Sequence, residues 1–198
     1  GLSQFQSFKY HVPGDISSAS FFIVLTILSI NSKMIIKSVN INESRIGIIK
    51  ILNMMGAGIQ FKNKKFYNGE KIADIYIKSK KNLKSVDCPS SLNSSAIDEF
   101  LIIFLVAAKS KGISKFKNLG EMNKKESKRL DLAVKFLKLI GIKVERIKND
   151  IKIHGNPKLS LSGSYEIKNF LKDHRIFFLS CITALTLGGE WKINDKDS

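Results

Sequence analysis

The chain has 198 residues, of which 43% are hydrophobic and 25% are charged, so it can bury one substantial core and is composed like an ordinary soluble domain. Its two cysteines, Cys88 and Cys181, lie far apart and follow no metal-ligand or redox spacing, which excludes a disulfide framework and a cysteine-built metal centre. The 33 Lys and Arg against 17 Asp and Glu give a formal charge of +16, which favours an anionic partner such as a phosphorylated metabolite, a nucleic acid or a membrane surface.

The first predicted element is a helix that follows Asp15. Residues 16–32 form the longest uncharged run, but they include several serines, and the length of the run is at the lower edge of what spans a membrane. We therefore expect a buried helix and no membrane association. Because no secretory signal precedes this helix, we also expect a cytoplasmic protein.

An aspartate followed by an apolar stretch occurs three times along the chain, at similar spacings. The three aspartates are Asp15, Asp98 and Asp173. Each stretch reaches a turn residue after about four helical turns, and the turn residues are Asn31, Gly112 and Gly188. A short segment with the alternation of a half-buried strand follows each turn, at residues 33–39, 113–119 and 190–193. The pattern predicts a helix followed by a strand each time.

A second helix is predicted after the first two of these strands. Its apolar positions have helical spacing, at Ile48, Ile51, Leu52 and Met55 in one case and at Leu130, Ala133, Val134 and Leu137 in the other. Each of these helices stops at a glycine, Gly56 or Gly141, and strand residues resume after it.

The predicted elements form a repeated βαβαββ unit, in the order strand, helix, strand, helix, strand, strand, which is an α/β (α+β) arrangement. A single domain at residues 1–198 would contain complete units at about residues 8–83 and 84–156 and a truncated third unit at 157–198. By the spacing of the second unit, the second helix of the third would begin near position 201. We therefore expect the chain to be part of a longer protein.

The starts of the three first helices are the candidate functional site. If these helices pack side by side in the same direction, their N-termini gather on one face, where backbone N–H groups and helix dipoles attract phosphates and carboxylates. The residues expected near this face are the hydrogen-bond donors Lys125, Arg129, His174 and Arg175 and the acids Asp98 and Glu126. Such donors suit oxyanion binding, and acids held among cations can exchange protons with a substrate.

Each of these residues also has a purely structural interpretation. An aspartate before a helix commonly caps its free N–H groups. Lys125, Glu126 and Arg129 would then be charges in the first turn of an amphipathic helix, and His174 with Arg175 would be surface polarity at a helix start. For any one residue the structural interpretation is favoured, and it is their combination that indicates a site.

Five short strings resemble the motifs of one enzyme family. They are VPGDISSA at residues 12–19, NESRIG at 42–47, IDEF at 97–100, KESKR at 125–129 and DHR at 173–175. In this order, on an independently detected repeat, they resemble the C-terminal portion of the EPSP synthase family along nearly the whole chain. The resemblance implies one half of a two-domain, inside-out α/β protein in which each half contains three βαβαββ units.

The resemblance also implies an activity, the transfer of the enolpyruvyl group of phosphoenolpyruvate to shikimate 3-phosphate, with no metal or other cofactor. It implies that Asp98 takes the proton of the attacking hydroxyl and that Glu126 protonates and deprotonates the methylene carbon. Lys125 would also assist proton transfer. The residues implied to bind the two substrates are Lys125, Arg129, His174 and Arg175.

Two departures from the family pattern bear on this activity. Lys128 stands where the family motif has an aspartate, which places a positive charge beside the phosphate-binding cluster. The other domain and a further lysine in the family's C-terminal segment are not in this sequence, so we expect the isolated chain to fold and to turn over negligibly.

Three other interpretations stay open. A basic nucleic-acid-binding module is supported by the charge of +16 and by lysines such as Lys62, Lys64 and Lys65, but no nucleic-acid motif or aromatic stacking pattern accompanies them. The second is a related enolpyruvyl transferase that acts on UDP-N-acetylglucosamine, and the KES and DHR strings favour the EPSP synthase family over it. The chain could also be a structural half without activity. The expected partners are therefore shikimate 3-phosphate, phosphoenolpyruvate and the missing domain, not nucleic acid or membrane.

Overall fold

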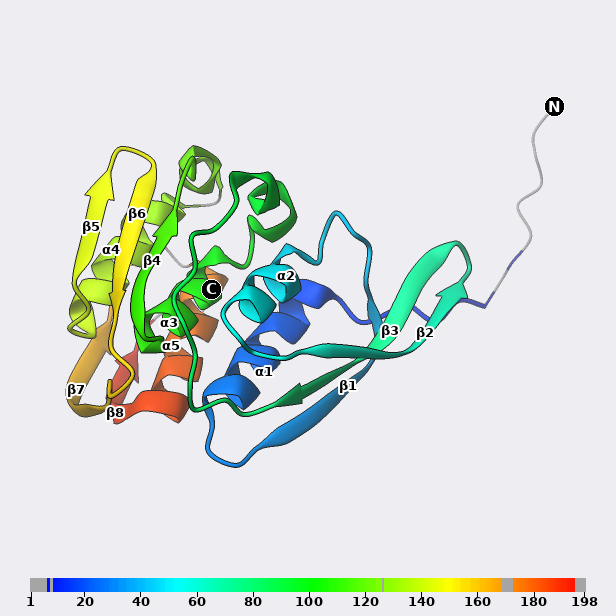
Figure 1. Ribbon diagram of the computed structural model, residues 1–198, viewed down its shortest axis with the longest axis horizontal. Coiled ribbons are helices and arrows are strands. Elements are labelled where there is room, and N and C mark those ends of the chain that lie inside the picture. The colour runs from blue at the N-terminus through cyan, green and yellow to red at the C-terminus, as the bar shows by residue number, and fades with distance from the viewer. Residues whose placement is uncertain (1–6, 8, 126, 169–172, 195–198) are drawn as a thin grey trace.

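Three apolar helices pack against one another through the middle of the computed structural model, which describes residues 7, 9–125, 127–168 and 173–194 (Figure 1). They are α1 (Ile16–Leu28), α3 (Phe100–Lys109) and α5 (His174–Leu187). Every residue of α3 from Phe100 to Ala108 is buried, as expected for a helix that is hydrophobic all round. The buried helix predicted after Asp15 is confirmed as α1. Within the described residues, no helix is long and apolar enough to cross a membrane.

Aspartates cap two of these three helices. The Asp15 side chain accepts the backbone N–H of Ser18 at 2.8 Å, and Asp173 accepts that of Arg175 at 3.0 Å. The structural interpretation of Asp98 as a cap is wrong, because α3 begins at Phe100 and no side chain caps it. The Asp98 carboxylate is instead bound by cations, as described below.

The chain leaves each central helix through a left-handed turn residue, as predicted. Asn31, Gly112 and Gly188 all have positive φ. At Gly188 the positive φ disfavours a side chain, and a steric clash also excludes one, because a Cβ there would lie 2.9 Å from the carbonyl oxygen of Leu161.

Two of the three sheets have the same strand order. The first contains β1 (Lys33–Asn40), β2 (Gln60–Tyr67) and β3 (Glu70–Lys78), and the second contains β4 (Gly112–Phe116), β5 (Val144–Ile147) and β6 (Asp150–Gly155). In both, the last strand of the three lies in the centre and pairs antiparallel with the other two, in the orders β1-β3-β2 and β4-β6-β5. The third sheet is a parallel pair, β7 (Leu161–Ile167) and β8 (Gly188–Ile193).

A strand is predicted at the start of each unit. It is complete only in the third unit, where it is β7 of the third sheet. In the first two units it is reduced to isolated parallel bridges, Gly14 with Val39, Lys84 with Lys111, and Asp87 with Lys115. Pro13 and Pro89 adjoin these segments and lack a backbone N–H, which limits how far the ladder can extend.

The second helices lie beside α3. They are α2 (Gly47–Met54) and α4 (Arg129–Leu139), and both pack against α3. Each is followed by the predicted glycine, Gly56 or Gly141, with positive φ. Short 3-10 turns precede α3, at η1 (Ser90–Leu92) and η2 (Ser94–Ala96), and α4, at η3 (Gly120–Lys124).

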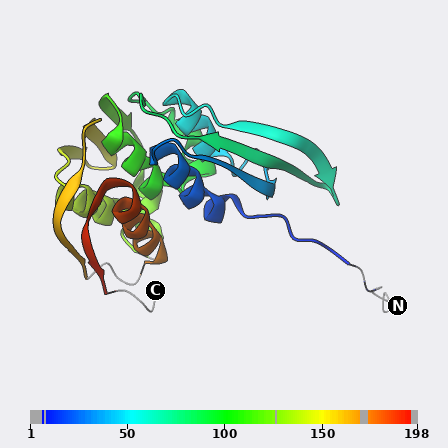
Figure 2. The same ribbon diagram turned by 90° about the horizontal axis from the view of Figure 1, so that it is seen from below.

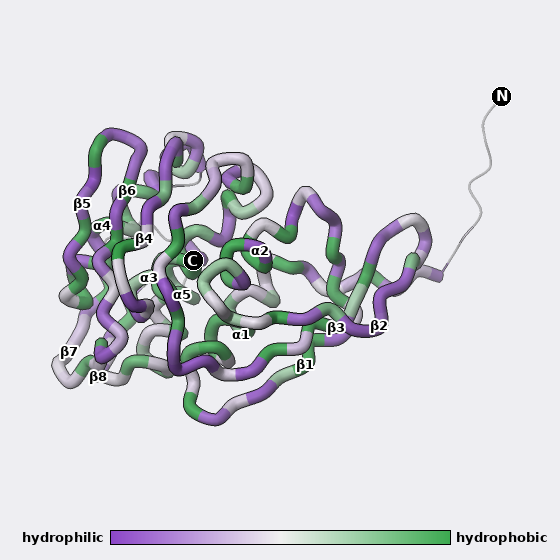
Figure 3. Tube along the Cα trace, viewed as in Figure 1, coloured by the Kyte–Doolittle hydropathy of each residue, from purple (hydrophilic) through white to green (hydrophobic). Residues whose placement is uncertain are grey.

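Each central helix is covered by the sheet of its own segment of the chain. The first sheet packs on α1, β6 of the second sheet packs on α3, and β8 packs on α5. Figure 2 shows β8 curving beside α5. The hydropathy is arranged accordingly, because the central helices are mostly apolar and the hairpins mostly polar (Figure 3). Apolar side chains of α1 and α5 nevertheless remain exposed: Phe22 is 54% exposed and Leu185 is 70% exposed.

Candidate functional site

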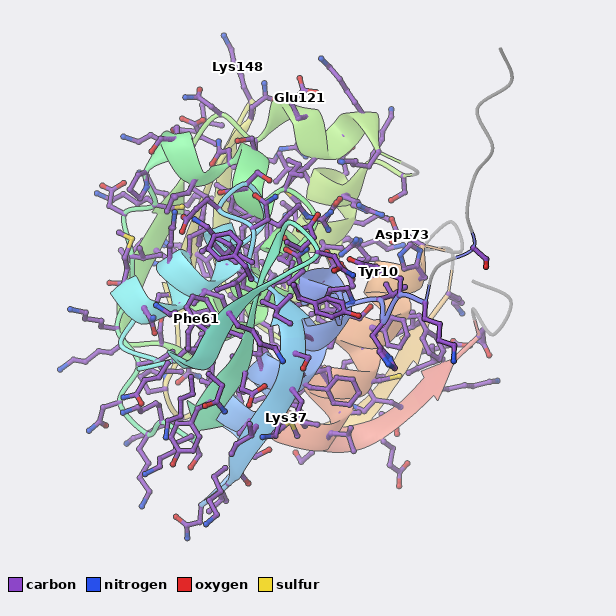
Figure 4. The ribbon with its side chains drawn as sticks, turned by 90° about the vertical axis from the view of Figure 1, so that its right-hand side faces the viewer. Tyr10, Lys37, Phe61, Glu121, Lys148 and Asp173 are labelled. Carbon is purple, nitrogen blue, oxygen red and sulfur yellow. The ribbon has the colours of Figure 1, made fainter. Side chains whose placement is uncertain are left out.

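The N-terminal ends of α1, α3 and α5 are joined by side chains, so the predicted gathering of the helix starts is confirmed. The Ser17 hydroxyl at the start of α1 donates to Oε1 of Glu99, which precedes α3, at 2.5 Å. Nη1 of Arg175, in the first turn of α5, donates to the carbonyl oxygen of Asp98 at 2.7 Å. Figure 4 labels Asp173 where the α5 ribbon begins.

Asp98 is the carboxylate on which the predicted cations converge. Its Oδ1 lies 3.2 Å from Nη1 of Arg129 and 3.3 Å from Nζ of Lys125, and its Oδ2 lies 3.9 Å from Nη2 of Arg175. Burial raises the pKa of Asp98, but the charges of Arg175, Lys125 and Arg129 outweigh it and hold the pKa below its usual value. Asp98 is therefore an ionised carboxylate at neutral pH, able to accept a proton.

Arg129 is buried between two carboxylates. Besides its contact with Asp98, its Nε donates to Oδ2 of Asp173 at 2.9 Å, and the side chains of Arg129 and Asp173 are 1% and 0% exposed. The same Oδ2 accepts the Ser127 hydroxyl at 2.6 Å. Burial raises the pKa of Asp173, and the bonds from Ser127 and Arg129 lower it further than burial raises it. This arrangement fixes the α4 start against the α5 start.

The guanidinium of Arg175 is bound through Nη1, whereas its Nε has no partner among the residues that the structure describes. Its side chain is 13% exposed, and Nη1 also lies 3.8 Å from Oε1 of Glu99. Its Nε is buried and has no hydrogen-bond partner within the described residues. A buried donor without an acceptor costs about 1–3 kcal/mol, so this edge favours any anion that can reach it.

His174 lies next to Arg175 at the mouth of a pocket between α1 and α5. The pocket has a volume of about 290 Å³. It is polar where the two helices begin and aromatic further along, and it is lined by Asp15, Ser17, Ser18, Phe21, Phe22, His174, Arg175, Phe178 and Ile182. His174 itself is exposed. The structure therefore brings together Asp98, Lys125, Arg129 and Arg175 and places His174 at their edge.

A family model described as EPSP synthase (3-phosphoshikimate 1-carboxyvinyltransferase) matches residues 1–198. The chain belongs to the EPSP synthase family. A curated EPSP synthase family member named 3-phosphoshikimate 1-carboxyvinyltransferase, from Endomicrobium trichonymphae, is 35% identical over 185 residues, which are 93% of this chain and 42% of the relative. One of the same name from Legionella pneumophila (strain Paris) is 40% identical over 168 residues, 85% of this chain and 37% of the relative.

Solved structures agree with this assignment. An EPSP synthase from Acinetobacter baumannii matches with a TM-score of 0.87 and 33% identity, over 94% of this chain and 42% of that one. The enolpyruvyl transferase NikO from Streptomyces tendae matches with a TM-score of 0.63 and 13% identity, which shows a shared fold alone. The present chain thus spans less than half the length of these EPSP synthases and is a part of such a protein.

Two sequence predictions for the KESKR string of this EPSP synthase segment concern Lys125 and Glu126. Lys125 was expected in the first turn of a helix, and this is wrong, because η3 takes up the preceding residues and α4 begins only at Arg129. Glu126, the second predicted acid, lies outside the described residues. Lys128, which departs from the EPSP synthase motif, is exposed at the start of α4. Burial raises the pKa of the nearby Asp131, but hydrogen bonds from Arg146 and Asn123 lower it further than burial raises it, and the charge of Lys128 adds a smaller lowering effect.

Sequence reasoning missed three residues that the structure places in the site. Arg45 donates to the Ser17 hydroxyl at 2.9 Å and lies 3.5 Å from Asp15, and Ser17 in turn bonds to Glu99. Ser17 lies in the VPGDISSA string, Arg45 in NESRIG and Glu99 in IDEF, so all three lie within the EPSP synthase motifs. No residue pattern assigned them a role.

The described residues hold no group of three or more His, Cys, Asp or Glu that could bind a metal ion. Both cysteines are free, and burial raises the pKa of Cys88 to about 11.

Proposed function

We propose that this chain supplies one half of an EPSP synthase site, in which the enolpyruvyl group of phosphoenolpyruvate is transferred to shikimate 3-phosphate to give EPSP and phosphate. Membership of the EPSP synthase family and the names of the curated relatives support the proposal. Because the chain spans less than half of those relatives, the remaining half of the site would come from the other domain of the same enzyme.

The observation that carries the proposal is the buried Nε of Arg175, which has no hydrogen-bond partner within the described part of the chain, on a guanidinium whose Nη2 lies 3.9 Å from the ionised carboxylate of Asp98. Both substrates carry phosphate, and one also carries a carboxylate, so either could supply the acceptor that Arg175 lacks. A carboxylate held ionised beside this anion site can take a proton from a hydroxyl of the bound substrate.

As the substrate hydroxyl attacks the central carbon of phosphoenolpyruvate, Asp98 takes its proton and Glu126 delivers a proton to the methylene carbon. The resulting ketal loses phosphate as Asp98 returns its proton to the leaving phosphate oxygen, and Glu126 takes its proton back from the methyl carbon. Lys125, Arg175 and His174 bind the anionic groups and stabilise the charge of the intermediate.

Arg129 contributes to this site from a buried position. Its guanidinium bonds to both Asp98 and Asp173, so it orients the proton acceptor in addition to adding positive charge near the phosphoenolpyruvate carboxylate.

Residues 1–198 form a single domain with units at about 8–83, 84–156 and 157–198. The identical strand orders of the first two sheets support the units, and the exposed apolar side chains of α1 and α5 support a third unit that is completed by further sequence.

The test is reconstitution. The purified chain is mixed with the remaining part of an EPSP synthase, and phosphate release from phosphoenolpyruvate and shikimate 3-phosphate is measured, with the Asp98→Asn chain as control. We expect turnover only in the mixture and only with Asp98 present. Robust turnover by the chain alone, or DNA binding that falls steeply with salt together with no response to shikimate 3-phosphate, would contradict the proposal.

A further inference from the structure

Glu99 is a buried acid at the point where the starts of all three central helices meet. It is 2% exposed, and it immediately follows Asp98. Its Oε1 accepts the Ser17 hydroxyl of α1 at 2.5 Å and lies 3.8 Å from Nη1 of Arg175 in α5. One carboxylate oxygen of Glu99, a residue of the second repeat unit, therefore contacts residues of the first and of the third unit.

Ser17 is itself bound by Arg45. Its hydroxyl accepts Nη2 of Arg45 at 2.9 Å, so its own proton is directed to Glu99. The result is a chain of contacts from Arg45 through Ser17 and Glu99 to Arg175. A buried acid is retained in such a position only when its partners compensate its desolvation.

Arg175 is fixed along one edge by this chain. Its Nη1 is bonded to the carbonyl oxygen of Asp98 and lies beside Glu99, whereas its Nε has no partner among the described residues. Because the guanidinium is planar and rigid, fixing Nη1 determines where the opposite edge points.

We propose that Glu99 is a positioning residue, which acts through Arg175 and together with Ser17 holds the unpaired edge of that guanidinium toward the bound anion. This inference rests on the proposed function, because it takes Arg175 as the anion ligand. It predicts that Glu99 influences anion affinity without touching the anion.

The groups that face Glu99 explain why its chemistry suits this role. Burial raises the pKa of Glu99, whereas Ser17, Arg175 and Arg45 lower it and neighbouring Asp98 raises it, and the pKa lies above its usual value. A glutamine at this position would keep the shape and the Ser17 contact and would lose the attraction for Arg175.

The experiment is a double-mutant cycle on the chain, with inorganic phosphate as the probe and calorimetry as the readout. Glu99→Gln, Arg175→Lys and the double variant are compared with the unmodified chain. The control is Glu145→Gln, the same chemical change in the partly exposed β5. Thermal unfolding midpoints of all variants report whether each one folds.

We expect Glu99→Gln to weaken phosphate binding on the order of tenfold, a size typical of coupling between contacting residues. We expect the same substitution to have no further effect in the Arg175→Lys background, and Glu145→Gln to bind phosphate like the unmodified chain. Should Glu99→Gln fail to fold, Ser17→Ala removes the same link from its other end and is expected to weaken binding in the same Arg175-dependent way.

Additive effects of Glu99→Gln and Arg175→Lys would overturn the inference, as would a lower unfolding midpoint with unchanged phosphate affinity. If Arg175→Lys alone leaves phosphate binding unchanged, the proposed anion ligand is wrong, and the failure then lies in the proposed function.

Discussion

The Nε of Arg129 donates a 2.9 Å hydrogen bond to Oδ2 of Asp173, and this ion pair is closed to solvent on both sides. The pair joins the first residue of α4 to the residue that caps α5. It therefore ties the second helix of one unit to the first helix of the next.

Replacing Arg129 by alanine should destabilise the fold strongly. The substitution leaves Asp173 buried without its counter-charge, which typically costs about 3–5 kcal/mol. Urea unfolding measures the change. The matched control is Arg146→Ala, which removes the half-exposed pair with Asp131 and should cost about 0–1 kcal/mol. Equal losses of unfolding free energy for the two variants would show that the buried pair stabilises the fold no more than the half-exposed pair does.

Asp98→Asn should separate binding from catalysis. The substitution removes a negative charge that faces three cations, so the chain should bind inorganic phosphate about tenfold more tightly. In the reconstituted enzyme the same variant should lose about 10²- to 10⁴-fold in turnover, because the proton acceptor is gone. Calorimetry and a phosphate-release assay measure the two effects. Weaker phosphate binding by Asp98→Asn would argue that Asp98 orients the cations more than it opposes the anion.

Asp74 should stabilise the first sheet in a pH-dependent manner. Its carboxylate accepts the Asn63 side chain at 2.8 Å, the backbone N–H of Ser38 at 2.9 Å and Nζ of Lys37 at 3.1 Å. The hydrogen bonds from Asn63, Ser38 and Lys37 lower the pKa of Asp74 from 3.8 to about 2. A lowered folded-state pKa gives stability that is complete above the unfolded value and is lost as the pH falls through the folded value.

The difference in unfolding free energy between the unmodified chain and Asp74→Asn should therefore be constant above about pH 5 and shrink between about pH 4 and pH 2. Urea unfolding across this range measures it. The other acids with lowered pKa are present in both proteins and cancel. A difference that does not change down to pH 2 would refute the assignment.

The exposed apolar side chains of α1 and α5 should make the isolated chain associate with itself. Replacing the exposed Phe22 and Leu185 together by serine should reduce association and change stability by no more than about 1 kcal/mol, because both are already exposed in the folded chain. Sedimentation velocity measures association. Phe104→Ala in the buried α3 is the comparison and should cost about 3–5 kcal/mol. A chain that is monomeric at high concentration both with and without the serines would contradict this use of the surface.

Much of the fold could be predicted from the sequence because its signals are local. An aspartate, an apolar stretch and a residue with positive φ mark each central helix, and Asn31, Gly112 and Gly188 end the pattern where predicted. The capping role of Asp98 could not be predicted correctly, since capping and ion pairing require the same residue type. The cations that decide between them are supplied from α4 and α5.

The site was predicted as a set of residues but not as a network. Asp98, Lys125, Arg129 and Arg175 converge as expected. The Ser17–Glu99 bond joins residues 82 positions apart, and neither residue has a spacing that suggests a partner. The burial of Arg129 was also beyond sequence reasoning, because an arginine near a helix start is usually exposed.

The most direct test of the account follows the side-chain Nε–H signal of Arg175 by NMR while phosphoenolpyruvate is added to the chain. We predict a saturable shift of this signal, which is absent from Arg175→Lys and retained in Asp98→Asn. If saturating phosphoenolpyruvate leaves the Arg175 signal unchanged while it shifts the signals of exposed lysines, the helix starts do not form the anion site and the central claim is wrong.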